Sequence, residues 1–347
     1  MGVTPAAAVL AVDAGNSKTD VALVAADGTV LGAARGGGFQ PQAVGVESAV
    51  DVVAAAVRAA VRDAAPGRDA PARGPYAAHV SACLANADLP VEEEQLTRAL
   101  AARAWGASTT VRNDTFAVLR AGADEPRGVA VVCGAGINCV GMLPDGRTAR
   151  FLAVGRLSGD WGGGAGLADE ALWHAARAED GRGGPTELAR ALPARFGLGS
   201  MRALIEALHL GRIPGGRRHE LAPVLFAVAA AGDPVARGLV ERLAEEVVTM
   251  AGVALERLGL GHGPDPVPVV LGGSVLAAGH RDLDTRIADL LRERAPAAVP
   301  RVVAAPPVLG AALLGLDHVA APAAAGAALR AHYATVHGSR AGADHAR

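Results

Sequence analysis

One order of secondary-structure elements occurs twice in this sequence, and the repeat limits the fold more than any other feature. Residues 9–36 read as a strand, a polar turn, a strand, an Asp-Gly turn and a third strand. Residues 129–155 read in the same order, again with an Asp-Gly turn before the third strand. Asp-Gly between β-rich runs is a strong hairpin signal. The repeat predicts two similar α/β lobes; the alternative is two unrelated meanders that share a turn type.

Helical sequence follows each of the two units. Residues 47–65, for example, carry apolar side chains near a 3.6-residue spacing. We place the first lobe at residues 1–113 and the second at 114–307, with a helix at about 308–331 that returns to the first lobe. The polar end of the chain, residues 332–347, is expected to be disordered.

Composition and charge exclude several classes of partner. The formal net charge of −2 gives no electrostatic reason to bind nucleic acid or an anionic membrane. No apolar run reaches the roughly 18 residues of a membrane span, and the first residues lack the basic segment of a signal peptide. Cys83, Cys133 and Cys139 show no C-x-x-C spacing, which favours buried thiols in a reducing compartment. We therefore expect a cytoplasmic protein.

Four polar or glycine-rich groups follow predicted strands, and strand ends are where α/β folds bind ligands. The groups are Asp13 with the turn at 15–19, then residues 112–115, 133–138 and 271–275. One glycine-rich turn alone carries little information, whereas the four groups together indicate a phosphate-binding site. The sequence contains neither the P-loop pattern nor G-x-G-x-x-G at a strand–helix junction.

These groups also carry a resemblance to a known family. The strings are DAGNSKTD (13–20), NDTFAVLRAG (113–122), GVAVVCGAGINCVG (128–141), SGDWGGGAGL (158–167) and VVLGGSV (269–275). In this order they resemble the motifs of the N-acetylglucosamine kinase and BadF/BadG-type ATPase family of the actin/hexokinase superfamily, and within it the glucosamine kinases of actinobacterial type. The resemblance implies two ribonuclease-H-like (actin-like ATPase) lobes that face a central cleft, ATP with Mg²⁺, and a sugar as phosphoryl acceptor.

The resemblance assigns roles to individual residues. Asp114 would take the proton of the sugar 6-hydroxyl, and Asp13 would hold Mg²⁺ through water. The alternative for Asp114 is an N-cap of the helix that follows it. The residues expected to bind the nucleotide are Gly15, Asn16, Ser17, Lys18, Thr19, Gly134, Ala135, Gly136, Gly272, Gly273 and Ser274, the last three at the adenosine.

Three positions expected near the sugar 2-substituent depart from the family pattern. Gln40 stands where an asparagine is usual, Ile137 where a serine or threonine is usual, and Trp161 where a glutamate is usual. Ile137 and Trp161 would fill the space of an acetyl group. The residues expected at the sugar are Gln40, Asn113, Asp114, Ile137, Asn138, Asp160, Trp161, Glu179 and Asp180.

Carboxylates near these positions suggest a cationic substrate. Asp160, with Glu179 or Asp180, would hold an ammonium group. We therefore favour a glucosamine kinase that forms glucosamine 6-phosphate and ADP, with an N-acetylglucosamine kinase as the alternative. For Glu179 and Asp180 the competing interpretation is the polar surface end of a helix.

Two further classes are built on the same fold. An activator-type ATPase needs cysteines that share an iron–sulfur cluster between subunits, a geometry that Cys133 and Cys139 do not offer inside a strand–turn–strand. A sugar-responsive repressor needs a helix-turn-helix and a basic face, and the sequence shows neither. We expect that the protein can form a homodimer.

Overall fold

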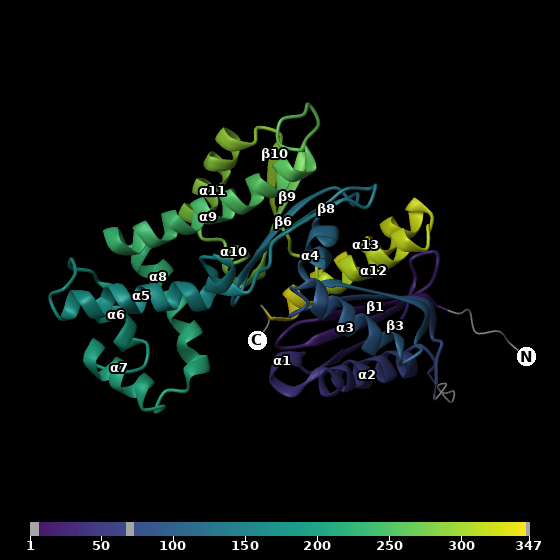
Figure 1. Ribbon diagram of the computed structural model, residues 1–347, viewed down its shortest axis with the longest axis horizontal. Helices are drawn as coiled ribbons and strands as arrows, with labels where there is room; N and C mark the ends of the chain where they lie inside the picture. Colours follow the sequence, from purple (N-terminus) through teal and green to yellow (C-terminus); the bar gives the residue numbers. More distant parts are fainter. Residues whose placement is uncertain (1–6, 67–72, 345–347) are drawn as a thin grey trace, which may run out of the picture. The chain divides into compact units, whose positions relative to one another are not determined.

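The computed structural model describes residues 7–66 and 73–344 and contains two five-stranded sheets (Figure 1). The first sheet has the order β3-β2-β1-β4-β5 and the second the order β10-β9-β6-β7-β8. The strands are β1 (Ala7–Ala14), β2 (Thr19–Val24), β3 (Val30–Gly36), β4 (Ala77–Leu84), β5 (Gly106–Asn113), β6 (Gly128–Cys133), β7 (Ile137–Met142), β8 (Thr148–Arg150), β9 (Val267–Gly272) and β10 (Ala298–Val302).

The two sheets share one topology. Strands β6 to β10 of the second sheet correspond, in chain order, to β1 to β5 of the first. Read from β8 to β10, the second sheet then has the same strand order as the first, which is third, second, first, fourth and fifth. In the first sheet β1 pairs antiparallel with β2 and parallel with β4, and in the second β6 pairs parallel with β9. The predicted repeat and the α/β fold class are therefore confirmed.

Contacts divide the chain into two compact units, which we describe separately. The first comprises the chain up to Gly128, residues 140–147 and residues from 303 onward; the second comprises residues 129–139 and 148–302. Helices of the first unit are α1 (Pro41–Val44), α2 (Val46–Asp63), α3 (Pro90–Ala101), α4 (Thr115–Gly122), α12 (Pro307–His318) and α13 (Ala323–Asp344). Those of the second are η1 (Gly155–Ser158), α5 (Gly163–Glu179), α6 (Leu188–Ala194), α7 (Met201–His209), η2 (Gly215–Glu220), α8 (Leu221–Ala230), α9 (Pro234–Leu258), α10 (Gly273–Leu276) and α11 (Arg281–Arg294).

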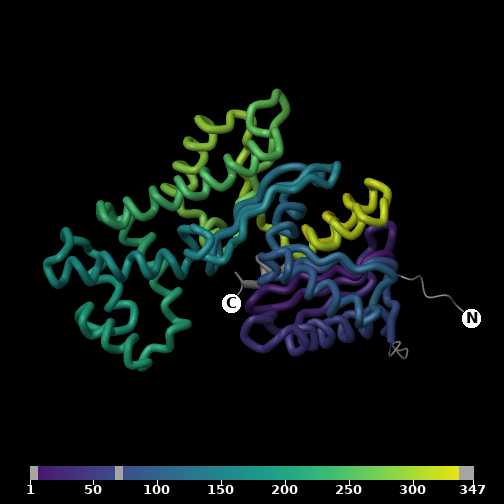
Figure 2. The backbone as a smooth tube through the Cα atoms, viewed as in Figure 1, coloured from purple at the N-terminus to yellow at the C-terminus, as the bar shows by residue number. Residues whose placement is uncertain are grey.

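The first sheet is buried by segments from both ends of the chain. Helix α2 packs on β2 and β3, and α12 packs on β1 and β4 (Figure 2). The apolar residues that recur along α2, including Val50, Val53 and Val57, are fully buried. On α12, the Ala311 carbonyl accepts a hydrogen bond from the Ser81 hydroxyl at 2.7 Å. The core is built from small aliphatic side chains, so the layers approach closely.

Helix α4 belongs to the first unit, although the sequence placed the lobe boundary at Asn113. Gly310 leaves room for the main chain of Ala117, where a Cβ would overlap the carbonyl. The buried Arg120 guanidinium forms a two-bond ion pair with Asp317 at 2.7 and 3.1 Å. These contacts join α4 to α12, and the boundary falls at Gly128 instead.

The end of the chain differs from the disordered tail expected at 332–347. Helix α13 continues to Asp344, and residues 345–347 lie outside the described part. Alanine, the strongest helix former, recurs along this segment and favours the helix despite its polar side chains. Within the described ranges, no single helix has the length and apolarity to cross a membrane; residues 215–230 and 234–258 reach that threshold only together, as a pair bent by 111°.

Candidate functional site

The carboxyl ends of β1, β4 and β5 meet at one edge of the first sheet. These strands are parallel, and their register places Ala14 beside Leu84 and Leu84 beside Asn113. Asp13 is the penultimate residue of β1, and Asp114 directly follows β5, where its main-chain N–H donates to the Leu84 carbonyl at 3.1 Å. The two aspartates singled out in the sequence therefore lie at the same sheet edge.

Asp13 is a nearly buried carboxylate in a charged neighbourhood. Its side chain is 7% exposed, and burial raises its pKa to about 8, with Asp114 and Asp20 adding to the shift. The positive charges of Lys18 and Arg35 lower the pKa but do not cancel the effect. None of the described residues donates a hydrogen bond to this carboxylate. A buried carboxylate without donors is costly, so the site is suited to a cation.

Asp20, which lies opposite Asp13 on β2, is held by two basic side chains. The Arg35 guanidinium binds both of its oxygens, at 2.6 and 3.0 Å, and the Lys18 ammonium lies 3.4 Å from one of them. This pairing keeps positive charge next to Asp13. Neither Asp20 nor Arg35 was predicted to have a role. Asp20 belongs to the DAGNSKTD string, whereas no sequence motif includes Arg35.

Asp114 does not cap helix α4 through its side chain. Its backbone is already helical (φ −60°, ψ −24°), and no side-chain cap hydrogen bond is formed. The N–H of Thr115 donates instead to the amide oxygen of Asn113 at 2.9 Å. Burial raises the pKa of Asp114 to about 6, against a lowering effect of the neighbouring N–H groups. A carboxylate whose pKa lies near neutrality is suited to accept a proton.

Asn113 occupies a position different from that expected of a sugar ligand. It is 1% exposed, and its side-chain amide donates to an Asp88 oxygen at 2.8 Å. Its main-chain N–H donates to Glu93 at 3.1 Å. With both ends of the amide engaged, Asn113 fixes the start of α4 and thereby the backbone of Asp114.

The turn between β1 and β2 is open to solvent at its tip. The N–H of Gly15 donates to the Lys18 carbonyl at 2.8 Å, and Asn16, Ser17 and Lys18 are exposed. Thr19 differs from the expectation that its hydroxyl would reach a phosphate. It is fully buried, and its hydroxyl donates to the Gly37 carbonyl at 2.8 Å, because Thr19 already lies within β2.

Gln40 lies against this same turn. Its side-chain amide donates to the main-chain carbonyl of Asn16 at 2.9 Å. The sequence predicted that Gln40 binds the sugar 2-substituent; in the structure its amide nitrogen instead supports the turn at residues 15–18.

The glycine-rich turn of the second unit packs on the start of helix α5. The N–H groups of Gly164 and Ala165 donate to the carbonyls of Gly134 and Ala135, at 2.7 and 3.1 Å. Gly163 has a φ of +72°, and a Cβ there would lie 2.5 Å from the Gly136 Cα. Ala135 and Gly136 remain exposed. The turn is thus held by its carbonyls, which leaves its outer face available to a ligand.

The end of β9 lies beside the same turn. Gly273 has a φ of +84°, and a Cβ there would overlap the main chain of Cys133, the last residue of β6. Gly272 is buried, whereas Ser274 is exposed at the start of α10. The close approach of these two backbones explains why position 273 is a glycine. Of the three residues Gly272, Gly273 and Ser274, Ser274 is the one that is exposed to solvent.

Trp161 and Ile137 lie together against helix α9. Both are buried, and a Cβ added at Gly162 would lie 3.0 Å from Leu243 of α9 and 3.5 Å from Ile137. The Arg242 guanidinium lies 4.2 Å from the centroid of the Trp161 ring. The indole N–H of Trp161 is buried without a hydrogen-bond partner among the described residues.

Asp160 organises the loop before Trp161. One of its carboxylate oxygens accepts from the N–H of Gly155 at 2.9 Å and from the hydroxyl of Ser158 at 2.6 Å. Its charge contributes to raising the pKa of Glu246 on α9, a shift caused first by burial. Asn138, on β7, accepts the next N–H, that of Cys139, at 2.7 Å.

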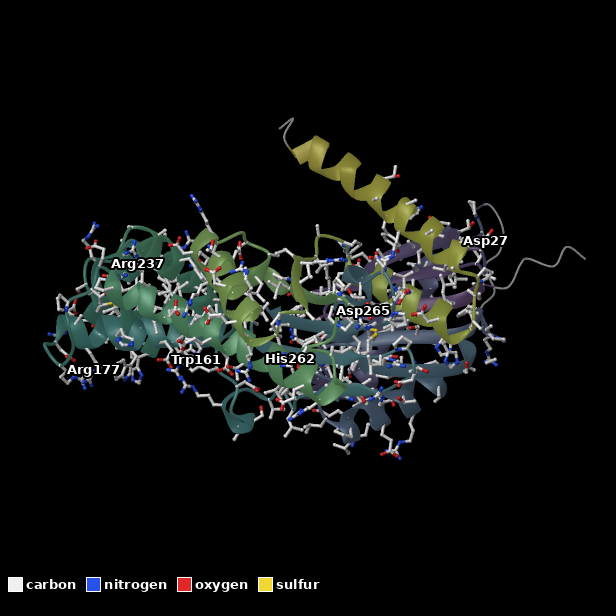
Figure 3. The ribbon with its side chains drawn as sticks, turned by 90° about the horizontal axis from the view of Figure 1, so that it is seen from above. Asp27, Trp161, Arg177, Arg237, His262 and Asp265 are labelled. Carbon is white, nitrogen blue, oxygen red and sulfur yellow. The ribbon has the colours of Figure 1, made fainter. Side chains whose placement is uncertain are left out.

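Glu179 and Asp180 do not belong to this group, contrary to the sequence-based prediction. They lie at the far end of α5, a 17-residue helix that is roughly 25 Å long, so they cannot share one sugar with Trp161. Figure 3 shows the separation of Trp161 and Arg177 along this unit. Glu179 accepts the N–H groups of Met201 and Arg202, both at 2.8 Å, and caps α7.

Asp180 pairs with Arg182 at 2.6 Å on the surface. Acidic side chains at the C-terminal end of α5 are unfavourable for the dipole of that helix. Glu179 instead stabilises the start of α7, where it accepts two N–H groups.

We expect Glu179→Gln to change stability but not sugar preference. The substitution leaves one acceptor and removes the charge at the start of α7, so unfolding should be easier by about 0.5–1.5 kcal/mol. Thermal denaturation measures this, with Asp180→Asn as a matched control at an exposed pair. A change of more than about threefold in the ratio of kcat/KM for two amino sugars would return Glu179 to the substrate site.

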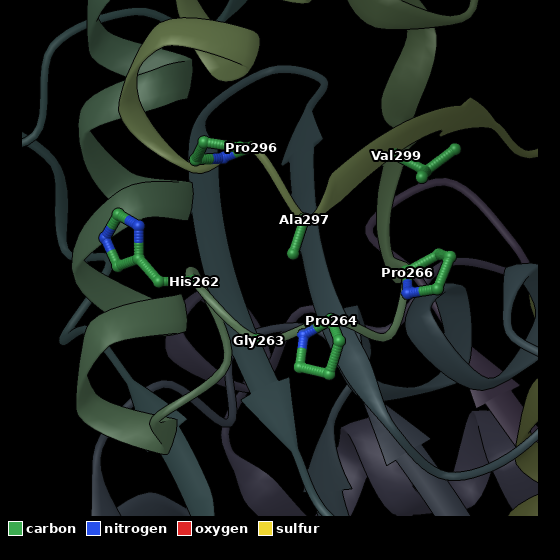
Figure 4. A pocket seen from close by; sticks show the side chains of 7 residues that line it. All are labelled: His262, Gly263, Pro264, Pro266, Pro296, Ala297 and Val299. Carbon is green, nitrogen blue, oxygen red and sulfur yellow. The ribbon is translucent and has the colours of Figure 1, made fainter.

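A separate cavity of about 260 Å³ lies away from these strand ends (Figure 4). It is lined mainly by prolines and His262, in the segments that precede β9 and β10. Because ligands of α/β folds bind at the carboxyl ends of strands, we do not assign this cavity to the site.

Across the described residues, no group of three or more His, Cys, Asp or Glu side chains is placed to hold a metal ion. Mg²⁺ does not need such a cage, because it keeps several waters and takes one or two carboxylates together with substrate phosphates. The donor-free carboxylate of Asp13 fits that requirement.

Duplicated sheets of this order, with aspartates and glycine-rich turns at their strand ends, define a protein of the actin-like ATPase fold. The chain matches the model of the BadF/BadG/BcrA/BcrD ATPase family over residues 10–315 and belongs to this family.

Individual relatives agree with this assignment. The N-acetyl-D-glucosamine kinase of Dictyostelium discoideum is 26% identical over 210 residues, which span 60% of this chain and 65% of that protein, just under two thirds of its length. The structure of a candidate N-acetylglucosamine kinase from Chromobacterium violaceum is 25% identical, with a TM-score of 0.65 over 89% of this chain and 98% of that one. A ROK hexokinase from Thermus thermophilus shares the fold, at 17% identity and a TM-score of 0.56 over 90% and 99% of the two chains.

Proposed function

We propose that the protein is an ATP-dependent sugar kinase that phosphorylates the 6-hydroxyl of a hexosamine, with N-acetylglucosamine as its substrate. The observation that carries this proposal is the pair Asp13 and Asp114 at one sheet edge, with pKa values raised to about 8 and about 6. Burial raises both pKa values, and the charge of Asp114 adds to the shift of Asp13. Carboxylates with raised pKa values of this kind are typical of catalytic sites. Family membership supports ATP as the phosphoryl donor.

In this proposal Asp114 is the general base. The 6-hydroxyl oxygen forms a bond to the γ-phosphorus, the bond from that phosphorus to the bridging oxygen breaks, and ADP leaves. The hydroxyl proton passes to Asp114, whose raised pKa makes it a better acceptor than an ordinary carboxylate. Asn113 fixes its backbone through the start of α4.

Each unit, taken by itself, has a turn that offers exposed groups to nucleotide phosphates. In the first unit the exposed tip Asn16–Lys18 offers N–H groups, one hydroxyl and one ammonium. In the second unit Ala135 and Gly136 offer exposed N–H groups, and Ser274 would contact the adenosine. Asp13 would hold Mg²⁺, and the positive charge of the ion would offset the charge of the phosphates.

We favour N-acetylglucosamine over glucosamine because the structure does not bring together the carboxylates that would bind an ammonium group. The case for free glucosamine needed Asp160 together with Glu179 or Asp180, and the latter two serve other contacts. Asp160 alone remains, with one oxygen already bound to Gly155 and Ser158. The names of the relatives from Dictyostelium and Chromobacterium also refer to N-acetylglucosamine. A homodimer, a cytoplasmic location and the lack of nucleic-acid or membrane partners stay predictions.

A comparison of sugars tests this assignment. We expect the highest kcat/KM for N-acetylglucosamine in a coupled ADP-release assay, with glucosamine lower by about 10-fold or more, since the amide makes hydrogen bonds that an amine cannot. Glucose and mannose complete the panel, and the product is identified as the 6-phosphate by mass spectrometry and NMR. A higher value for glucosamine would reverse the substrate assignment, and no ADP release with any sugar would reject the kinase.

A further inference from the structure

Asn86 belongs to none of the sequence motifs and lies in the short segment between β4 and α3. It follows β4 by two positions and has a φ of +61°, a left-handed conformation that asparagine tolerates better than most residues. The main-chain N–H of the preceding residue, Ala85, donates to the Ala14 carbonyl at 2.8 Å, which continues the pairing of β4 with β1. Asn86 therefore lies at the sheet edge where the phosphate turn begins.

The side chain of Asn86 joins two separate segments. Its amide nitrogen donates to the Asn16 side-chain oxygen at 2.9 Å and to the Phe39 carbonyl at 3.2 Å. An asparagine amide has two N–H donors, so both are used, one on each segment.

The two segments also contact each other closely. The N–H of Phe39 donates to the Gly15 carbonyl at 2.9 Å, and Gln40 donates to the Asn16 carbonyl at 2.9 Å. Gly38 has no room for a Cβ against the Asn16 carbonyl. These contacts join the phosphate turn (Gly15 to Lys18) to the loop Gly36 to Gln40. The conformations of the two segments therefore depend on each other.

We propose that Asn86 is a positioning residue that couples the phosphate turn to the Gly36–Gln40 loop, so that nucleotide and sugar bind cooperatively. The coupling to sugar rests on the proposed function, in which Gln40 of that loop keeps its amide nitrogen on Asn16 and offers its amide oxygen to the sugar. Asn86 touches neither substrate; it acts by holding both loops in their binding conformations. A coupling of this kind is reciprocal, so each ligand raises the affinity for the other.

Isothermal titration of Mg·AMPPNP, with and without N-acetylglucosamine, tests the proposal. In Asn86→Gly, which keeps the positive φ and removes both donors, we expect the nucleotide Kd to rise roughly 5- to 30-fold. We also expect the effect of sugar on that Kd to disappear. Asn86→Asp, nearly isosteric but without donors, should behave like Asn86→Gly. A role limited to overall stability would lower Tm and leave Kd unchanged in the folded fraction.

Gln42→Ala serves as the matched control. It removes a hydrogen bond of 3.3 Å to the Asn86 carbonyl but leaves the Asn86 side chain in place, so Kd should stay within twofold. Unchanged nucleotide Kd and unchanged sugar effect in Asn86→Gly would overturn the proposal. If the wild type binds nucleotide but no sugar, the sugar assignment and the cooperativity are both overturned. Wild-type protein that binds no nucleotide would overturn the positioning role as well.

Discussion

Asp114→Asn should lower kcat by about 100-fold or more, because the amide cannot accept the hydroxyl proton. Binding of Mg·AMPPNP should change little, since Asp114 is assigned to the sugar. At saturating Mg·ATP, where the bound cation keeps Asp13 ionised, the wild-type kcat/KM for the sugar should fall as pH drops below about 6, because Asp114 becomes protonated, and should level off above that value. The residual activity of the variant should not show this decrease at low pH. Steady-state kinetics between pH 5 and 8 measure both effects.

The same substitution should stabilise the ligand-free protein. The pKa of Asp114 in the folded state, about 6, is higher than its ordinary value of 3.8. The folded state therefore holds this proton more tightly than the unfolded chain and loses stability as pH rises from about 4 to about 6. Asp114→Asn lacks this loss, so its unfolding free energy at pH 8 should exceed that of the wild type by on the order of 1–3 kcal/mol. The difference should vanish near pH 4.

A carboxylate at the opposite end of the first unit provides the control for Asp114. Asp27 is exposed in the β2–β3 turn, where it accepts the N–H of Thr29 at 2.9 Å, and Figure 3 marks its position. Asp27→Asn should leave kcat within twofold. Near-normal turnover of Asp114→Asn would place the base elsewhere, and a loss of stability in that variant would indicate a structural role.

Gly163→Ala should raise the Kd for Mg·AMPPNP by about tenfold or more. Gly163 has a φ of +72°, and its new Cβ would lie 2.5 Å from the Gly136 Cα and 2.6 Å from the Ala135 carbonyl oxygen. Because both contacts are main chain, the glycine-rich turn itself must shift. The left-handed conformation adds a cost of about 1–2 kcal/mol for alanine. Isothermal titration gives the affinity, and thermal denaturation reports the accompanying loss of stability.

Gly166→Ala, three residues further along α5, separates the local clash from a general effect of alanine. No atom lies within 4 Å of a Cβ at Gly166, and its φ is not in the left-handed region. This variant should bind nucleotide normally and gain roughly 0.5–1 kcal/mol of stability from helix propensity. If both variants bound nucleotide equally well, the turn at Gly134–Gly136 would lose its assigned role.

The sequence by itself determined the two sheets and the positions of the two aspartates. Hydrophobic spacing and Asp-Gly turns are local signals, and they repeated in the same order, so the duplicated topology followed from them. Asp13 and Asp114 could be placed at strand ends because parallel strands of an α/β sheet bring their carboxyl ends to one edge.

Only the tertiary structure decided which partner each polar side chain takes. Thr19 bonds to Gly37, Gln40 to Asn16, and Glu179 to the start of α7, although the sequence suggested a ligand for all three. Each side chain has few donors and acceptors, and a buried or partly buried group is satisfied by whatever the fold brings nearest. Those neighbours lie 18 to 24 residues away in the chain, beyond the reach of local pattern.

Asn86 is the converse case, a residue for which the sequence suggested no role. Nothing in the short run between β4 and α3 marks it as different from any turn asparagine. The role proposed for it rests on hydrogen bonds to Asn16 and Phe39, which are 70 and 47 residues away in the chain. Spacing along the chain thus predicted where the candidate site lies, while packing in three dimensions decided which of its polar side chains already have a partner within the protein.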